Sequence, residues 1–289
     1  MRFRPITTTG AAEPTRGSDR KNVRLHSRST IGLLLAAGAA LVAAFEFAPR
    51  ALLKRNFGAY SDAKLHDAFG RALVEYWRSG TPAFPASLTT LVDYWFQWHA
   101  IKVAISSLSV IVFALLATAL WQRYLRNQAW YAAVATAATV STVAATGVLV
   151  LNIQATAVPL VALLGLLPGR TADGKLAQVL SQMREGLTKS ASPHAGSPAL
   201  TVLLGEVERY FWVMVAISAT LMMATVLASV LFWKRRIAAD PSATRVRFMH
   251  STLGVITALT ACLLLLVTAA YAFSALEPAT WLLGVVGAG

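Results

Sequence analysis

Residues 85–123 read PASLTTLVDYWFQWHAIKVAISSLSVIVFALLATALWQR, and this stretch decides the fold class of the chain. An aromatic cluster opens it, an apolar run follows, and Trp121 and Arg123 close it. Trp98 precedes Trp121 by 23 residues. At helical rise this is roughly 35 Å, the thickness of a hydrocarbon core with part of the headgroup layers. Because aromatic rings favour both of those layers, the stretch predicts a transmembrane helix.

Residues 198–235 repeat this design, with their own aromatic cluster and a closing Trp-Lys-Arg. At an offset of 112 residues the tetrapeptide VAIS occurs twice, at 103–106 and at 215–218, and Trp121 aligns with Trp233. Two copies of one transmembrane helix are therefore predicted. Chance similarity between helices rich in Ala, Leu and Val is the alternative.

The composition excludes an ordinary soluble domain. The chain is 56% hydrophobic and only 13% charged, whereas a soluble domain carries about 25% charged residues. A single cysteine, Cys262, excludes intrachain disulfides and cysteine metal clusters. A net charge of +13 could indicate nucleic acid as a partner. Most of the excess, however, flanks apolar runs on one side of the predicted membrane, so no nucleic-acid partner is expected.

Five apolar runs predict an all-α, polytopic integral membrane protein with five transmembrane helices. A disordered, basic, cytoplasmic tail is expected over residues 1–29. Repeat unit 1 (30–121) is expected to hold a transmembrane helix at 30–48, an outer helix at 61–78 and a transmembrane helix at 99–121. Repeat unit 2 (130–233) is expected to hold a transmembrane helix at 130–152, an outer helix at 172–188 and a transmembrane helix at 210–233. Residues 251–289 are expected to form the fifth transmembrane helix and a short outer tail.

Two of these segments have alternative interpretations. The basic tail could be an organelle transit peptide, and the first apolar run could be a signal peptide. That run is long for a signal peptide and no convincing cleavage site follows it, so a retained helix is predicted. The apolar run from 130 to 168 is too long for one crossing. Its second part, 155–168, is therefore expected to be a short surface helix or a re-entrant piece.

The two outer helices are predicted to be amphipathic. Apolar residues recur at helical spacing in both: Leu65, Phe69, Leu73 and Tyr76 in the first, and Leu176, Leu180, Met183 and Leu187 in the second. The tetrapeptide DAKL at 62–65 opens the first, and DGKL at 173–176 opens the second. Each repeat unit crosses the membrane twice, so the two copies are predicted to be parallel.

The distribution of charge predicts the threading. Segments 1–29, 122–129 and 234–250 together hold 14 Lys and Arg against 3 Asp and Glu, while the rest of the chain holds 12 against 10. Positive residues stay on the cytoplasmic side. We therefore expect a cytoplasmic N-terminus in a bacterial inner membrane, with the C-terminus and both long loops outside.

Polar residues gather at the outer ends of the predicted spans, and seven of them form the candidate ligand-binding set: Glu46, His99, Lys102, Asn152, Gln154, Glu206 and Glu208. If the spans bundle, these side chains would meet in one layer and could hold the polar head of a ligand. The plainer interpretation is that helix ends meet water. Glu46 would then pair with Arg50, and Asn152 and Gln154 would satisfy carbonyls that Pro159 frees.

Two predicted spans carry small residues four apart: Ala36, Ala40 and Ala44 in the first, and Ala137, Ser141 and Ala145 in the third. This spacing lets helix backbones approach closely. These spans are therefore expected at the centre of the bundle or at a contact between copies.

The sequence leaves the molecular function open. It contains no metal, phosphate-loop or serine-nucleophile motif, so no metal site or catalytic residue is predicted and the cofactors are unknown. The leading hypothesis is a non-enzymatic membrane protein whose outer helices bind membrane lipid, another membrane protein or a second copy. The alternative is a membrane enzyme or carrier for a small or lipidic molecule, with its polar site at the outer helix ends.

Overall fold

The computed structural model describes residues 19–57, 61–126, 128–167, 174–189 and 197–287, and every regular element within these ranges is a helix. Five helices are long and apolar enough to cross a membrane: α1 (Asp19–Phe57), α3 (Ala86–Leu125), α4 (Tyr131–Ala157), α7 (Pro198–Ala238) and α8 (Thr244–Leu276). We call these the span helices. Four helices are shorter: α2 (Asp62–Ser79), α5 (Pro159–Leu164), α6 (Gly174–Lys189) and α9 (Pro278–Gly287). The prediction of an all-α chain with five membrane-length helices is confirmed.

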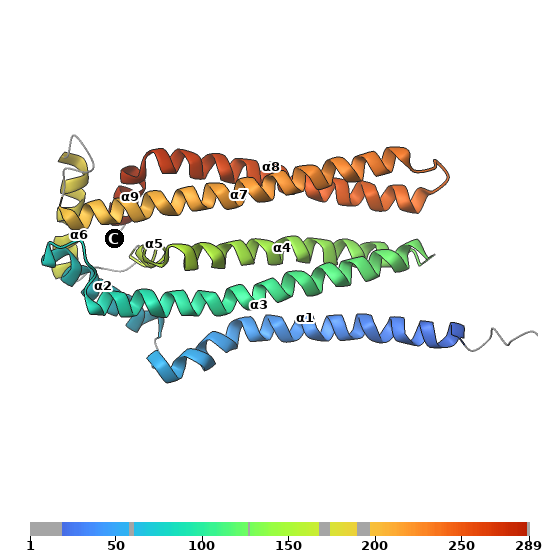
Figure 1. The fold of residues 1–289 in the computed structure, drawn as a ribbon, viewed down its shortest axis with the longest axis horizontal. Coiled ribbons are helices and arrows are strands. Elements are labelled where there is room, and N and C mark those ends of the chain that lie inside the picture. Colours follow the sequence, from blue (N-terminus) through green and yellow to red (C-terminus); the bar gives the residue numbers. More distant parts are fainter. Residues whose placement is uncertain (1–18, 58–60, 127, 168–173, 190–196, 288–289) are drawn as a thin grey trace, which may run out of the picture.

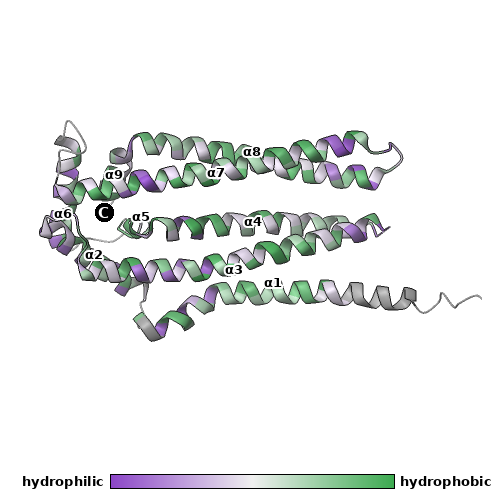
Figure 2. Ribbon diagram, in the orientation of Figure 1, coloured by the Kyte–Doolittle hydropathy of each residue, from purple (hydrophilic) through white to green (hydrophobic). Residues whose placement is uncertain are grey.

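The span helices lie side by side along the long axis of the molecule (Figure 1). The four short helices gather at one end of them. The start of α1 and the connections α3–α4 and α7–α8 lie at the opposite end, which we call the connection end. Figure 2 shows mostly hydrophobic residues along the span helices and hydrophilic ones where α7 and α8 reach the connection end.

Helix α1 is longer than predicted at both ends. It begins at Asp19, within the segment 1–29 that was expected to be a disordered tail; residues 1–18 of that segment lie outside the described residues. It also continues through Pro49 to Phe57, beyond the predicted end of the transmembrane helix at residue 48. The apolar run marks only the part of a helix that lipid can cover, because backbone hydrogen bonds continue where polar side chains are solvated. Pro49 lacks an N–H, and α1 bends toward its C-terminal end in Figure 1.

Helices α3 and α7 also extend well beyond the predicted spans 99–121 and 210–233. They contain 40 and 41 residues, so each is about 60 Å long, roughly twice the thickness of a hydrocarbon core. Helix α3 starts directly after Pro85. Helix α7 starts directly after Ser197, whose side chain caps the helix. The first turns of α3 and α7 therefore project beyond these predicted spans and reach the four short helices.

Neighbouring span helices form two antiparallel hairpins with polar links. In the α3–α4 hairpin, Trp121 Nε1 donates to Thr139 Oγ1 at 3.1 Å. In the α7–α8 hairpin, Thr268 Oγ1 donates to Ser218 Oγ at 2.9 Å. Helix α1 packs along α3, and the two hairpins touch each other much less than their own helices do. Hydrogen bonds of this kind help to fix helix pairs where lipid offers no hydrophobic drive.

The expected central position of the small-residue spans is wrong for α1. This helix lies at one edge of the molecule (Figure 1), and both Ala36 and Ala40 are exposed. It contacts α3 through another face, where an added Cβ at Gly38 would lie 3.2 Å from the Phe113 ring. Backbone approach at a glycine, rather than the alanine spacing, therefore selects the packed face. The alanine face stays uncovered in this single chain.

Candidate functional site

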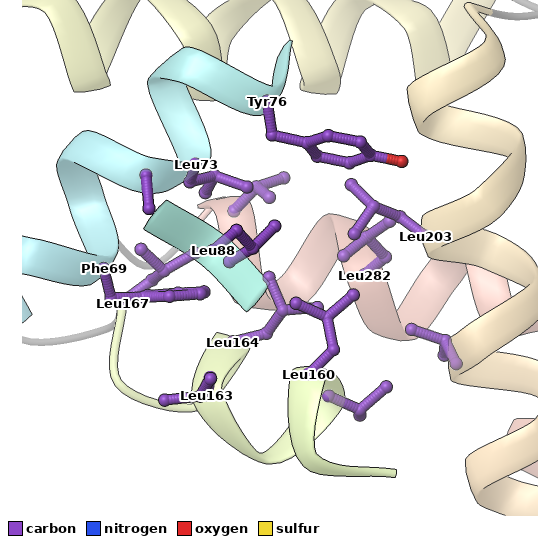
Figure 3. Packing of buried hydrophobic residues seen from close by; sticks show 14 of the residues in the cluster. Phe69, Leu73, Tyr76, Leu88, Leu160, Leu163, Leu164, Leu167, Leu203 and Leu282 are labelled. Atoms are coloured by element: carbon purple, nitrogen blue, oxygen red, sulfur yellow. The ribbon is translucent and has the colours of Figure 1, made fainter. Parts of the chain in front are cut away.

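The largest cluster of buried side chains lies at the end of the span helices that is opposite the connection end. We call it the cap: helices α2, α5, α6 and α9 with the first turns of α3 and α7 (residues 61–98, 158–167, 174–189, 197–211 and 278–287). Eleven of the twelve largest fully buried side chains belong to the cap core: Phe69, Leu73, Tyr76, Leu88, Leu160, Leu163, Leu164, Met183, Leu200, Leu203 and Leu204. Figure 3 shows Phe69, Leu88, Leu164 and Leu203 of this core close together, from α2, α3, α5 and α7. The cap is thus a small globular assembly with its own hydrophobic core.

Local sequence positions the cap helices. Ser61 caps the start of α2 by accepting a hydrogen bond from the backbone N–H of Lys64, and Gly80 ends α2 at a left-handed φ of 63°. Two further bonds tie α6 to its neighbours. Trp77 Nε1 donates to Gln182 Oε1 at 2.9 Å, which links α2 to α6. Arg184 donates to the Val286 carbonyl at 2.9 Å, which links α6 to α9.

Tyr76 places a hydroxyl inside the cap core, where it has no hydrogen-bond partner among the described residues. Its side chain is fully buried, and its ring packs edge-on against Phe84 at 5.2 Å between centroids. Figure 3 shows the hydroxyl pointing towards the helix that carries Leu203. Burial, reinforced by the nearby charge of Glu206, raises the pKa of Tyr76 to about 12. The neutral phenol is therefore strongly favoured there.

Glu46 and Lys102, two of the predicted site residues, lie close together. The ammonium of Lys102 lies 4.5 Å from the Phe45 ring centroid and 5.5 Å from the Trp98 ring centroid. It also interacts electrostatically with the charges of Glu46 and Arg50. Arg50 lies 3.7 Å from Glu46, as the sequence predicted. Both members of this pair are largely exposed, so it adds little stability. The cluster joins α1 to α3 and offers cations beside aromatic rings.

His99, on the same helix, is turned towards its own backbone. Its Nδ1 lies 3.0 Å from the carbonyl oxygen of Trp95, and the two rings are tilted by 42° with their centroids 4.6 Å apart. The carbonyl accepts, so Nδ1 carries the hydrogen in this geometry. The hydrogen bond of His99 therefore stays within its own helix.

Asn152 and Gln154 lie where α4 ends. Asn152 is buried and donates from Nδ2 to the Val148 carbonyl of its own helix at 2.7 Å. The Gln154 backbone carbonyl receives the last helical bond, from Val158 N–H at 3.2 Å, while its side-chain Oε1 is buried without a partner. The amides therefore mark the helix break before Pro159, and no described contact joins them to the other predicted site residues.

Glu206 and Glu208 occupy the first part of α7. Glu206 lies 3.8 Å from Arg209 and influences Tyr76, so it borders the cap core. Glu208 is exposed. Charge effects thus link Lys102 both to Glu46 and to His99. Among the described residues, no contact joins these three to Asn152, Gln154, Glu206 or Glu208, so the predicted polar layer is not seen as one connected cluster.

Two features of the structure had no counterpart in the sequence prediction. One is an apolar groove of about 370 Å³ between α4 and α7, lined by Thr146, Leu149, Val150, Ile153, Ala216, Ile217, Thr220 and Leu221. The other is a basic pocket on the cap that involves Arg71, Arg78 and Lys175. The spacing of seven between Arg71 and Arg78 already placed both on one face of the helix. Only the fold shows that Lys175 faces them.

Within the described ranges, no group of three or more His, Cys, Asp or Glu side chains is placed to hold a metal ion. Comparison of the chain with protein-family models, with curated proteins and with solved structures finds no match. The case for a function therefore depends on the geometry of this chain.

Proposed function

We propose that this chain is a non-catalytic, multi-pass protein of a bacterial inner membrane that acts by binding a partner protein or lipid through its cap. The cap core is the observation that carries the proposal. Short loops are enough to connect antiparallel helices. Here the connections between spans instead build a packed assembly from four extra helices and extended turns of α3 and α7. Such an assembly is a rigid surface on which binding residues can be held.

The exposed faces of α2 and α6 are the proposed binding surface. Each helix buries one face in the cap core, Leu65, Phe69 and Leu73 on α2 and Val179, Leu180 and Met183 on α6. The exposed positions of both helices include polar or charged residues: Lys64, Arg71, Glu75 and Arg78 on α2, and Lys175, Gln178, Ser181 and Gln182 on α6. This division supports amphipathic helices that turn one face into the cap core and expose the other.

The charge at the two ends supports an outward-facing cap. The connection end carries Arg123, Arg126, Lys234, Arg235 and Arg236. Excess Lys and Arg remain in the cytoplasm. The connection end would then be cytoplasmic and the cap, with α9, would lie outside.

A parallel duplication of repeat unit 1 (α1, α2 and α3) and repeat unit 2 (α4, α6 and α7) also fits the order of the helices. The equivalent helices α3 and α7 contain 40 and 41 residues. Each directly follows a shorter helix, with α2 before α3 and α6 before α7. Ser106 and Ser218, which occupy equivalent positions, are both buried. Each hydroxyl donates to a carbonyl four residues earlier in its helix, at 2.7 Å. The duplication would explain why both halves contribute to one cap.

Cysteine labelling tests the orientation. In a Cys262→Ala background, Ser181→Cys places a thiol on exposed α6, and the matched Ser242→Cys places one in the exposed α7–α8 connection. A membrane-impermeant maleimide added to intact cells should label the first variant only. The second should react only after the membrane is permeabilised. The reversed pattern would show that the cap faces the cytoplasm.

Photo-crosslinking tests the binding role. A photoreactive amino acid at exposed Gln178 of the cap should give a discrete adduct with one protein or lipid in native membranes. The control is Leu227, a lipid-facing position that is 57% exposed in α7. Adducts that are identical at both positions, or absent from all exposed cap positions, would contradict the proposal.

The Glu46–Lys102 cluster favours the second candidate, an enzyme or carrier with its site at the outer helix ends. Native mass spectrometry of the intact chain from a mild detergent separates the two. A retained non-lipid molecule that is lost on Glu46→Gln or His99→Ala would support the second candidate. A chain that carries only lipid or a partner would support binding through the cap.

A further inference from the structure

A pocket of about 280 Å³ opens on the cap surface between α2 and the start of α6. Its walls are formed by Gly70, Arg71, Val74, Glu75, Arg78 and Lys175. The five α2 residues are spaced by one, three, one and three positions, so they share one face of the helix. Lys175 approaches from the first turn of α6. We call this the basic pocket.

A glycine allows the two helices to approach closely at this pocket. Gly70 is buried, and a Cβ added there would lie 3.1 Å from Cδ2 of Leu176. That distance is tighter than ordinary van der Waals contact, so a Cβ at this position would require the Leu176 side chain to shift by a few tenths of an ångström. The hydrogen bond from Trp77 to Gln182 fixes the same pair of helices further along. The walls of the basic pocket are thus held by the packing of the cap.

The charges in the basic pocket are unbalanced. Arg71, Arg78 and Lys175 are exposed, and none of them has an ion-pair partner among the residues that the structure describes. Glu75 is the only carboxylate in the lining, and one of its oxygens already accepts a 2.6 Å hydrogen bond from the Ser87 hydroxyl. Three cations against one anion leave the pocket with two excess positive charges. The first turn of α6 adds the positive end of a helix dipole.

We propose that the basic pocket binds a phosphate group, either of a phospholipid headgroup or of a soluble phosphorylated compound. A phosphate ester carries up to two negative charges, which would balance the excess. Two guanidinium groups offer paired N–H donors that match phosphate oxygens, and the lysine adds a point charge. The inference rests on the proposed role of the cap as a binding surface, and it names the chemical group that the surface recognises.

Equilibrium dialysis with radiolabelled inorganic phosphate tests the pocket in the purified full chain. The Arg71→Gln/Arg78→Gln double variant should bind phosphate at least about tenfold more weakly, because hydrogen bonds to charged groups are worth about 1.5–3 kcal/mol. The matched control is Lys54→Gln, which removes an exposed cation of α1 outside the pocket and should leave phosphate affinity unchanged. All three substituted side chains are exposed, so each variant should fold.

Glu75→Gln provides a test in the opposite direction. It removes the only negative charge of the lining while keeping an acceptor for Ser87. Phosphate should then bind about two- to fivefold more tightly, the usual range for exposed charges. The affinity of the wild-type chain should also fall as salt is added.

A second arm distinguishes the two sources of phosphate. The chain is reconstituted in nanodiscs of phosphatidylcholine with or without phosphatidylglycerol, and the dialysis is repeated. If phosphatidylglycerol lowers the binding of phosphate to the wild-type chain, and this effect is lost in the double arginine variant, the pocket is assigned to a lipid headgroup. Unchanged phosphate binding would assign it to a soluble compound. No binding by the wild-type chain, or equal binding by the double variant, would overturn the inference. Adducts at Gln178 that persist in that case would leave the proposed function of the cap intact.

Discussion

The cap and the span helices bury their apolar residues in opposite ways. Cap helices such as α2 turn Phe69, Leu73 and Tyr76 into a shared core and leave polar residues outside. In the most apolar stretch of each span helix, only 6% to 22% of the residues are buried within the chain. The exposed remainder includes large side chains such as Leu227 and Leu266. The cap therefore has the organisation of a protein that folds in water, and the spans that of a protein covered by lipid.

The difference shows which force holds each region. Water drives apolar side chains together in the cap, with about 1.5–3 kcal/mol for each fully buried large side chain. Lipid offers no such drive, so the spans depend on close backbone approach, shape and a few hydrogen bonds. Substitutions of the same kind should consequently have unequal effects in the two regions.

The largest contrast is expected for leucine truncation. Leu73→Ala removes a fully buried side chain from the cap core and should lower the free energy of unfolding of the cap by about 2–5 kcal/mol. Leu227→Ala, at a position 57% exposed in α7, should change it by less than about 0.5 kcal/mol. Hydrogen exchange of the α2 and α6 amides measures this. Equal protection in the two variants would show that the cap core does not stabilise the cap.

Glycine substitutions should show where the spans do depend on packing. A Cβ at Gly254 of α8 would lie 3.0 Å from Nε1 of Trp233, whereas one at Gly147 of α4 would meet nothing within 4 Å. Gly254→Val should therefore weaken α7–α8 association by about 1–3 kcal/mol. Gly147→Val, which introduces the same side chain, should be nearly neutral. Thermal unfolding in detergent compares the two, and similar midpoints would contradict the close contact.

Tyr76→Phe tests how a buried hydroxyl affects the stability of the cap core. The variant removes a buried hydroxyl without a partner and should stabilise the cap by about 1 kcal/mol at neutral pH. Burial raises the pKa of Tyr76 from 10.0 to about 12, so the neutral phenol contributes stability below pH 10 that is lost as pH rises through 12.

Chemical denaturation at several pH values measures both effects. The stability difference between Tyr76→Phe and the wild-type chain should widen between pH 10 and 12, because only the wild-type chain has this phenol to ionise. A constant difference across that range would mean that the hydroxyl reaches water or a proton acceptor in the folded cap.

The smallest effect is expected for hydrogen bonds between spans. Thr268→Val removes the 2.9 Å bond to Ser218 and should cost about 0.6 kcal/mol. Thr118→Val is the matched control, because that hydroxyl bonds only to the Ala114 carbonyl of its own helix and is exposed. Steric trapping of the α7–α8 pair would measure the loss. An effect above about 2 kcal/mol would show that polar contacts, and not shape, dominate the association of the spans.

Several features could be read from the sequence because they follow from local patterns. Apolar runs located all five span helices, and helical spacing located α2 and α6. Pro159 and Pro278 each separate a span helix from a short helix that follows. Lipid-facing helices must be apolar over a fixed length, so composition alone reveals them.

The candidate site was less accessible from sequence. The Glu46–Arg50 pair lies four residues apart on one helix and was predicted, whereas the position of Lys102 between Phe45 and Trp98 required the packing of α1 on α3. Helix ends were also missed, because the polar turns of α1 and α3 resemble loops until tertiary contacts stabilise them. Leu53 and Leu88, for instance, are buried only because the cap surrounds them.

The sequence by itself determined that the chain has five membrane-length helices and two surface helices, since both depend on the periodicity of neighbouring residues. Only the tertiary structure decided that residues from 53 to 286 meet in one cap core and that Lys175 faces Arg71 and Arg78. Contacts between residues about a hundred positions apart depend on how helices cross, and small side chains such as Gly70 and Gly254 set those crossings. A helical pattern records which face is apolar, but not which neighbour that face will meet.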